Sequence, residues 1–467
     1  MESMSNPGIN RCPVEVLIAF IEASEHDDRR TLRGVNKVWR TLATPLAFDS
    51  LMLEHTKEGV ARMIKLFRAR LAKWAKRLEY RAGDQAPLAF GDTALIPRTH
   101  IPLARICANI ACSLGAAANQ QDPVTKAVTA ILSDLTRLFP LLESFHVRLF
   151  AGRHFEALHV PMTREEIIAG VSKYIMQQFN VFDALTEAGN SPPLRLKTLS
   201  LRNLLPCPEP AMMEEGFKTL MESVENLTLT VHRARTLDSQ EYWEAFWQEY
   251  LPDYILAPAQ SSLTSLSMTS DQPVGTEWPG VNFPSLHFPS LRSLKLGGFC
   301  FDIDSNLEDF ILRHQTTLTS LVLDSCPMHT GATFRNKIPQ RKWSQVFDRL
   351  EVGLTELTYV RVMCKYLWGL DVEASPRTEM ALTYETSTSG YGYNRGEPVN
   401  SAVEREDRRA LEKFYVTVDE RRRMEGLGPL ESLAAARARP QDRLPRAEEF
   451  PELIDMVMAG LLTTHFG

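Results

Sequence analysis

Two stretches near the start of the chain organise the rest: Cys-Pro-Val-Glu-Val-Leu-Ile-Ala-Phe-Ile at residues 12–21, and Leu-Arg-Gly-Val-Asn-Lys-Val-Trp-Arg-Thr-Leu-Ala at residues 32–43. Pro13 suits the first turn of a helix, where its missing N–H costs nothing. Apolar residues recur at helical spacing through both stretches, and Pro45 is expected to end the second run. The pattern predicts three short helices. Because so few residues bury little surface, they need a partner or the rest of the chain for stability.

Composition limits the class of protein. A chain of 467 residues that is 44% hydrophobic and 24% charged fits a soluble globular protein of two or three domains. Its formal net charge of -6 argues against nucleic acid as a partner. The seven cysteines show no close pairing motif, which indicates a reducing compartment. No apolar run is long enough to cross a bilayer, and the N-terminus lacks a signal peptide, so we expect no membrane and a cytoplasmic or nuclear location.

A second pattern recurs in the middle of the chain. Leu-x-x-Leu-x-Leu, or a close variant, begins at Leu196, Val224, Leu263, Leu291, Leu318 and Leu357, with degenerate copies near Leu78 and Leu142. The alternating end of each copy predicts a short half-buried strand, and the segments between are helical or looped. One strand and one helix in each period of roughly 20 to 29 residues indicates leucine-rich repeats.

Other segments carry weaker signals. Helices are predicted over 57–80, 124–138, 163–187, 403–424 and 449–462. The first has a basic face, typical of a membrane-surface or calmodulin-type target, or of a scaffold helix with a solvated side. The aromatic residues of 242–250 indicate either a ligand cage or core packing.

The first stretch resembles an F-box, through Pro-x-Glu-Val-Leu at 13–17 and Val-x-x-x-Trp-x-x-Leu-Ala at 35–43. In that family the helices bind the Skp-type adaptor of a cullin–RING ubiquitin ligase. The resemblance implies that the adaptor is contacted by Pro13, Val16, Leu17, Val35 and Trp39. Cys12 and Asn36 depart from the residues usual at their positions, and Gly34 would stand inside a helix at a cost of about 1 kcal/mol. A short helical cap without an adaptor is the alternative.

Residues 242–362 are similar to a fungal family of F-box proteins with leucine-rich repeats, through the phrases at 262–267, 287–297 and 317–327. The predicted fold is therefore α/β, with a three-helix F-box at 9–53 and an irregular, horseshoe-like leucine-rich-repeat solenoid at 57–370. A flexible loop or linker rich in Ser, Thr, Gly and Tyr is expected at 371–401, and a helical C-terminal cap at 402–467.

No pattern typical of an enzyme appears in the sequence. It has no phosphate-binding loop, no Gly-x-Ser-x-Gly and no His-Glu-x-x-His, and Cys107 and Cys112 lack a second pair of cysteines. We therefore expect no catalytic residue, no metal and no cofactor. An active site assembled from distant residues stays open as an alternative.

Residues that flank the inward leucines of each strand are expected to point outward. A protein substrate would then be contacted by Arg202, Asn226, Lys295, Asp324, Tyr359 and Arg361, unless the true site lies in an insertion or loop. The predicted function is a substrate receptor of an SCF-type ubiquitin ligase, which binds a Skp-type adaptor and, through it, a cullin. The alternative is a leucine-rich-repeat interaction scaffold with a degenerate F-box.

Overall fold

The computed structural model describes residues 12–82, 123–149, 164–190, 192–232, 244–275, 280–281, 283, 286–301, 306–329, 341–365, 377–379, 382–388, 392–394 and 401–430. The predicted helix over 449–462 lies outside these ranges, and so do Cys107 and Cys112.

The N-terminal helices are α1 (Val14–Ala23), α2 (His26–Leu32) and α3 (Lys37–Ala47). Their small core contains Leu17, Ile21, Trp39 and Ala43. Arg29 of α2 closes the end of α1, because its guanidinium donates hydrogen bonds to the carbonyls of Glu22 and Ser24. Pro45 lies inside α3 instead of ending it. It occupies the last turn of the helix.

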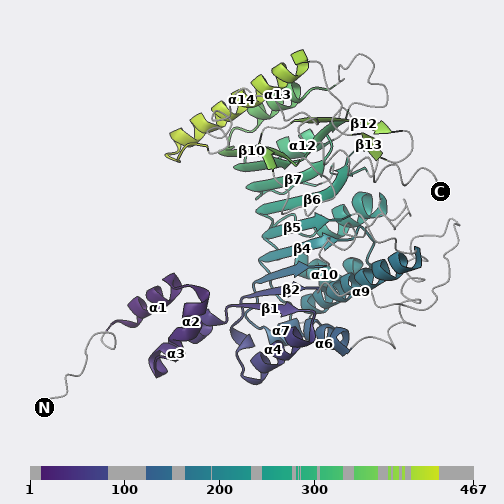
Figure 1. Ribbon diagram of the computed structural model, residues 1–467. Coiled ribbons are helices and arrows are strands. Elements are labelled where there is room, and N and C mark those ends of the chain that lie inside the picture. Colours follow the sequence, from purple (N-terminus) through teal and green to yellow (C-terminus); the bar gives the residue numbers. More distant parts are fainter. Residues whose placement is uncertain are drawn as a thin grey trace, which may run out of the picture.

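A large sheet follows. Its parallel strands are β1 (Ser50–Glu54), β2 (Arg77–Arg81), β3 (Ser144–Arg148), β4 (Thr198–Leu204), β5 (Asn226–Val231), β6 (Ser265–Val274), β7 (Ser293–Phe299), β8 (Ser320–Asp324) and β10 (Tyr359–Lys365). Each strand pairs with the next in chain order, and antiparallel β11 (Arg377–Glu379) closes the far edge. In Figure 1 the strands stack from β1, beside the purple N-terminal helices, to β10 at the opposite end.

The segments between the strands carry α4 (Lys57–Arg68), η2 (Ala72–Trp74), α6 (Pro123–Leu132), α7 (Leu135–Leu138), α9 (Arg164–Gly189), η3 (Pro210–Met213), α10 (Glu215–Met221), η4 (Phe246–Leu256), α12 (Leu307–Leu312), β9 (Pro327–His329) and α13 (Trp343–Gly353). Figure 1 shows α9 and α10 together on one side of the sheet. Phe182 of α9 and Phe217 of α10 pack with their ring centroids 5.5 Å apart. Both side chains are fully buried, so the two helices share one core with the sheet.

Alternation along the strands separates an apolar face from a polar face. Leucines stand in register on adjacent strands at positions 199, 227, 266, 294 and 321, and all of them are buried. The residues before them, at positions 198, 226, 265, 293 and 320, also stand in register and are half-buried threonine, asparagine and serines. Successive side chains of a strand point to opposite faces, so the sheet turns its leucines to the core and its polar residues outward.

The predicted fold class is wrong as stated. The structure is an α/β protein built on one sheet with nine parallel strands, and not an F-box followed by a leucine-rich-repeat solenoid. The repeated leucine pattern predicted the positions of the strands, because alternation is a property of a half-buried strand. It did not predict the segments that connect the strands. The connections are unequal, since β2 and β3 are separated by residues 82–143 and β7 and β8 by residues 300–319.

The helix predicted over 57–80 is also corrected. Helix α4 ends at Arg68, Arg70 takes a left-handed backbone conformation with φ of 55°, and β2 begins at Arg77. Left-handed residues do not continue a right-handed helix. Val60 and Met63 of α4 are buried in the main core, as the scaffold-helix interpretation predicted.

The far end of the sheet is covered by α14 (Ser401–Met424). Leu411, Phe414 and Val418 are fully buried there, and the Val362 N–H of β10 donates a hydrogen bond of 2.8 Å to the Tyr415 hydroxyl. The segment 371–401, predicted as a flexible loop or linker, contains β11, β12 (Thr383–Thr388) and β13 (Gly392–Asn394). Strand β12 is anchored because the buried Tyr384 hydroxyl contacts the Asp407 carboxylate of α14.

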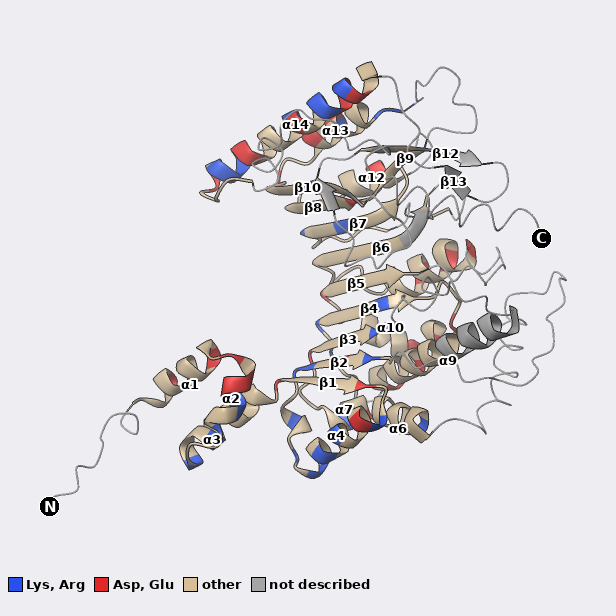
Figure 2. Ribbon diagram, in the orientation of Figure 1, with Lys and Arg blue, Asp and Glu red and all other residues tan. Residues whose placement is uncertain are grey.

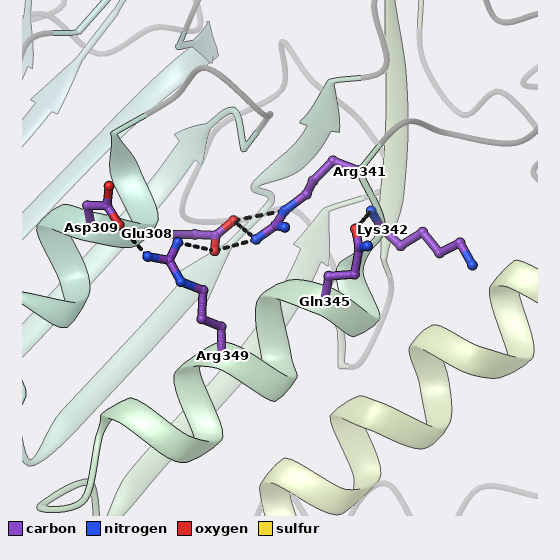
Figure 3. A network of polar contacts seen from close by, with 6 residues as sticks. All are labelled: Glu308, Asp309, Arg341, Lys342, Gln345 and Arg349. Carbon is purple, nitrogen blue, oxygen red and sulfur yellow. Dashed lines mark hydrogen bonds and ion pairs between the residues drawn. The ribbon is translucent and has the colours of Figure 1, made fainter.

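A buried carboxylate links α12 to α13. Glu308 accepts hydrogen bonds from Arg341 at 2.6 and 2.7 Å and from Arg349 at 3.1 Å, and Arg349 also bonds Asp309 at 2.6 Å (Figure 3). Glu308 is only 4% exposed. A carboxylate removed from water needs such partners, so this network fixes how the two helices pack.

Candidate functional site

The N-terminal helices carry an unusual amount of exposed apolar surface. Val14, Val16, Phe20, Val35 and Val38 are each at least 50% exposed. Val14 lies on the other side of α1 from Val16 and Phe20, so we call Val16, Phe20, Val35 and Val38 the apolar patch. Elsewhere in the described chain, the exposed large apolar residues include Val352 of α13 and the neighbouring Met424 and Leu427 at the end of α14. Single exposed apolar residues are normal, whereas a group of them marks a surface that binds something.

The apolar patch is held by the small core beneath it. Val16 and Phe20 are one helical turn apart on α1, and Val38 lies in the first turn of α3. The Phe20 ring meets the buried Trp39 ring edge-to-face, with centroids 5.8 Å apart. Trp39 of α3 therefore packs against α1 and holds the exposed Phe20 ring in place.

The predicted adaptor contacts divide into two groups. Pro13, Val16 and Val35 are exposed, whereas Leu17 and Trp39 are 6% and 3% exposed and belong to the core. Sequence reasoning missed Phe20 and Val38. The spacing of four residues between Val16 and Phe20 placed both on one helix face, but nothing in the sequence said which of the two apolar faces of α1 would be covered.

Two of the three departures from the F-box pattern have a local explanation. The Asn36 side chain caps α3 by accepting a hydrogen bond of 3.0 Å from the Trp39 N–H, so this asparagine stabilises the helix. Gly34 lies in the turn between α2 and α3 and not inside a helix, which corrects the expected cost. Cys12 is half-buried and packs against the N-terminal core.

The polar face of the sheet is the second candidate surface. It holds all six residues predicted to contact a substrate: half-buried Arg202, Asn226, Lys295, Tyr359 and Arg361, and buried Asp324. The Lys295 ammonium lies 3.8 Å from the Asp324 carboxylate across β7 and β8. The structure brings these two together and leaves Arg202 and Asn226 on β4 and β5, away from them.

The opposite end of the same face is basic. Arg81, Arg148 and Arg202 stand in register on β2, β3 and β4, and we call them the arginine row. Figure 2 shows blue at the ends of these strands, while β5 and β6 carry none. Sequence reasoning missed Arg81 and Arg148, because the strand copies near Leu78 and Leu142 were degenerate and the residues that follow them were not counted among the outward positions. The signal was present as polar residues alternating around Leu78 and Phe145.

His146 lies next to this row. It is in register with Glu79 on β2 and Ser200 on β4. Burial lowers the pKa of His146, and the positive charges of Arg77 and Arg202 lower it further, against the opposing effect of Glu79.

The aromatic residues near 246–250 and the thiol of Cys326 have structural roles. Phe246, Trp247 and Tyr250 are buried, and Trp247 packs edge-to-face on Phe246 and Phe299, so the core-packing interpretation is confirmed for these residues. Tyr242 and Trp243 lie outside the described residues. Burial raises the pKa of the Cys326 thiol to about 12, which leaves it unreactive as a thiolate.

The described ranges contain neither a metal-ligand cluster nor a membrane-spanning helix. No three His, Cys, Asp or Glu side chains there gather as metal ligands. None of the helices there combines the length and apolarity that crossing a bilayer requires.

Comparison with known proteins adds no family. No protein-family model matches the chain, and no curated protein matches it.

Proposed function

We propose that this chain is a non-catalytic substrate receptor of an SCF-type cullin–RING ubiquitin ligase. The apolar patch on α1 and α3 binds a Skp-type adaptor, and through it a cullin, while the polar face of the sheet binds a protein substrate. The chain then acts by proximity, because it raises the effective concentration of substrate lysines near the ubiquitin-bearing subunits. The proposal assigns the chain to the cytoplasm or nucleus.

The observation that carries the proposal is the apolar patch. Val16, Phe20 and Val38 are each more than 50% exposed on helices whose own core holds few residues. These side chains are already about half covered, so burying the rest against a partner contributes roughly 1 kcal/mol each, which adds affinity and stabilises the helices. The F-box resemblance of residues 13–17 and 35–43 names the class of partner.

A second candidate is an interaction scaffold that does not bind the adaptor. The burial of Leu17 and Trp39 favours it, because two of the five residues expected to touch the adaptor are turned into the core. The two candidates differ in one measurable property, which is binding to a Skp-type adaptor.

The test is co-purification of the full chain with a Skp-type adaptor. The variant Val16→Glu/Phe20→Glu places two charges on the apolar patch, and Val352→Glu/Met424→Glu places the same charges on exposed apolar positions far from it. We expect the wild-type chain and the second variant to retain the adaptor and the first to lose it. Loss of the adaptor by both variants, or no binding by the folded wild-type chain, contradicts the proposal.

A further inference from the structure

Positive charge is concentrated at the β1 end of the molecule. Residues 57–77 contain eight lysines and arginines and one acidic residue, Glu58, although the whole chain has a formal net charge of -6. Figure 2 shows blue gathered along α4 and the turn that follows it. All eight basic side chains are exposed, and we call them the basic surface: Lys57, Arg62, Lys65, Arg68, Arg70, Lys73, Lys76 and Arg77.

Most of the basic surface is not neutralised within the chain. Arg62 forms an ion pair with Glu54, and the Lys73 ammonium lies 4.9 Å from the centre of the Trp74 ring. The other six form no ion pair with any residue that the structure describes. Unpaired charges of one sign raise the local potential, which acts on a charged partner over about 8 Å at physiological salt.

The basic surface adjoins the helices that carry the apolar patch. Helix α4 packs on η2, and η2 packs on α3. Helix α3 continues the positive charge, because exposed Lys37 and Arg40 stand on either side of Val38 in the sequence. No acidic residue occurs between Arg29 and Asp49. Positive charge therefore runs from the α3 side of the apolar patch onto α4.

The α1 side of the apolar patch carries the opposite charge. Residues 13–28 contain no lysine or arginine and five acidic residues, all of them exposed: Glu15, Glu22, Glu25, Asp27 and Asp28. They lie on α1 and at the start of α2. The sign of the charge thus changes across the apolar patch, from acidic beside α1 to basic beside α3 and α4. A charged partner can approach this surface favourably in one orientation only.

We propose that the surface of the Skp-type adaptor that docks on the apolar patch is flanked by acidic side chains, and that these face the basic surface. The inference rests on the proposed function for the identity of the partner. Charge complementarity of this kind speeds association and fixes orientation more than it adds affinity. The basic surface thereby steers the adaptor onto the apolar patch.

Two other polyanions fit the surface less well. A lipid bilayer takes up the apolar face of a basic helix, but Val60 and Met63 of α4 are buried in the main core. A nucleic acid is negative along its whole length, so the acidic residues of α1 would repel it where it crossed the apolar patch. A protein surface can carry both signs, as the change of charge across the patch requires.

The experiment measures how fast the full chain associates with a Skp-type adaptor, by stopped-flow fluorescence at about 0.1 M and about 1 M salt. The Debye length is about 10 Å in the first condition and about 3 Å in the second. The variant Lys65→Glu/Arg68→Glu reverses two exposed charges in the last turn of α4. Its matched control, Arg405→Glu/Arg409→Glu, reverses two exposed charges of α14, at the far end of the sheet.

We expect the α4 variant to slow association about tenfold or more at the lower salt and less than about twofold at the higher salt, because salt screens the steering. The control variant should change the rate less than about twofold in both conditions. Lys65→Gln/Arg68→Gln, which removes the charges without reversing them, should slow association by a smaller factor. It also carries the comparison if thermal unfolding shows that the Glu variant does not fold.

The inference is overturned by equal slowing in the α4 and control variants, by slowing of the α4 variant that is the same at both salts, or by no slowing at all. The chain is also mixed with phosphatidylserine vesicles and with duplex DNA. Binding of either that the α4 variant loses, with adaptor association unchanged, would assign the basic surface to that other class of partner. Adaptor binding without these salt effects overturns this inference alone, whereas no adaptor binding by the folded wild-type chain overturns the proposed function as well.

Discussion

The N-terminal helices and the sheet bury their apolar residues to very different degrees. In the sheet the leucines at 227, 266, 294 and 321 are at most 1% exposed, and polar residues occupy the other face. In α1–α3 a core of four buried residues coexists with the exposed apolar patch. The sheet thus covers its leucines within the chain, whereas the helices leave apolar side chains exposed. The difference teaches that binding surfaces are recognised by incomplete burial as well as by chemistry.

The largest expected effect contrasts a leucine of the sheet with a phenylalanine of the apolar patch. Leu294 is fully buried in β7, so Leu294→Ala should lower the free energy of unfolding by about 2–5 kcal/mol. Phe20 is 56% exposed, so Phe20→Ala should cost less than about 0.5 kcal/mol. Urea unfolding of both variants measures the contrast. A Phe20→Ala cost equal to that of Leu294→Ala would show that the ring is covered within the chain.

The next effect is a pH dependence of stability that comes from His314, which follows α12 beside the sheet. His314 accepts a hydrogen bond of 3.1 Å from the Phe288 N–H on Nε2, and Nδ1 lies 2.8 Å from the Phe310 carbonyl, which suits the neutral ring. Burial lowers the pKa of His314 to about 4. The unfolded state, with a histidine pKa near 6.5, then binds more protons between these values. The neutral His314 ring therefore contributes its full share of folding stability above pH 6.5, and this contribution is lost as the pH falls through about 4.

His314→Leu isolates this contribution from other titrating groups. At pH 7 the variant loses both hydrogen bonds and the favourable neutral ring. Between pH 6.5 and 4 the free energy of unfolding of the wild-type chain falls by of order 3 kcal/mol through this group. The difference in stability between the wild-type chain and the variant should shrink by a similar amount. Chemical unfolding at pH 7 and pH 4.5 measures it. A difference that is constant with pH would contradict the neutral buried ring.

The smallest effect compares a buried ion pair with an exposed one. Glu308, with two arginines around it, is 4% exposed, so Glu308→Gln should lower the free energy of unfolding by about 2 kcal/mol. Asp27 of α2 lies 3.6 Å from Arg30 with its side chain 91% exposed, and Asp27→Asn should leave the melting temperature unchanged. Thermal unfolding of the two variants is the measurement, and equal effects would remove the contrast in ion-pair burial.

The strands were the most predictable feature of this chain, and the connections the least. Alternation around Leu199, Leu266 and Leu321 located β4, β6 and β8, because it is a local consequence of one buried face. The predicted fold class was wrong because the segments between the strands differ in length and structure. Their packing decides that structure, and a repeat period in the sequence does not describe it. The left-handed turn at Arg70, which separates α4 from β2, has no glycine to signal it.

The candidate sites were predictable only in part. Pro13, Val16 and Val35 are exposed as expected, yet burial of Leu17 and Trp39 depends on which face of α1 meets α3. The arginine row depends on register between residues 81, 148 and 202, which lie far apart in the chain. Cross-strand register is a tertiary property, so charges that each looked isolated in the sequence meet only in the folded sheet.

The most direct test of the division between helices and sheet is amide hydrogen exchange of the full chain with and without a saturating Skp-type adaptor. The account predicts slower exchange over 14–23 and 35–43 when the adaptor is present, with exchange in β1–β8 unchanged. Unchanged exchange in the helices, or slowing confined to the sheet, would contradict it. Either result would show that the apolar patch is not the adaptor-binding surface.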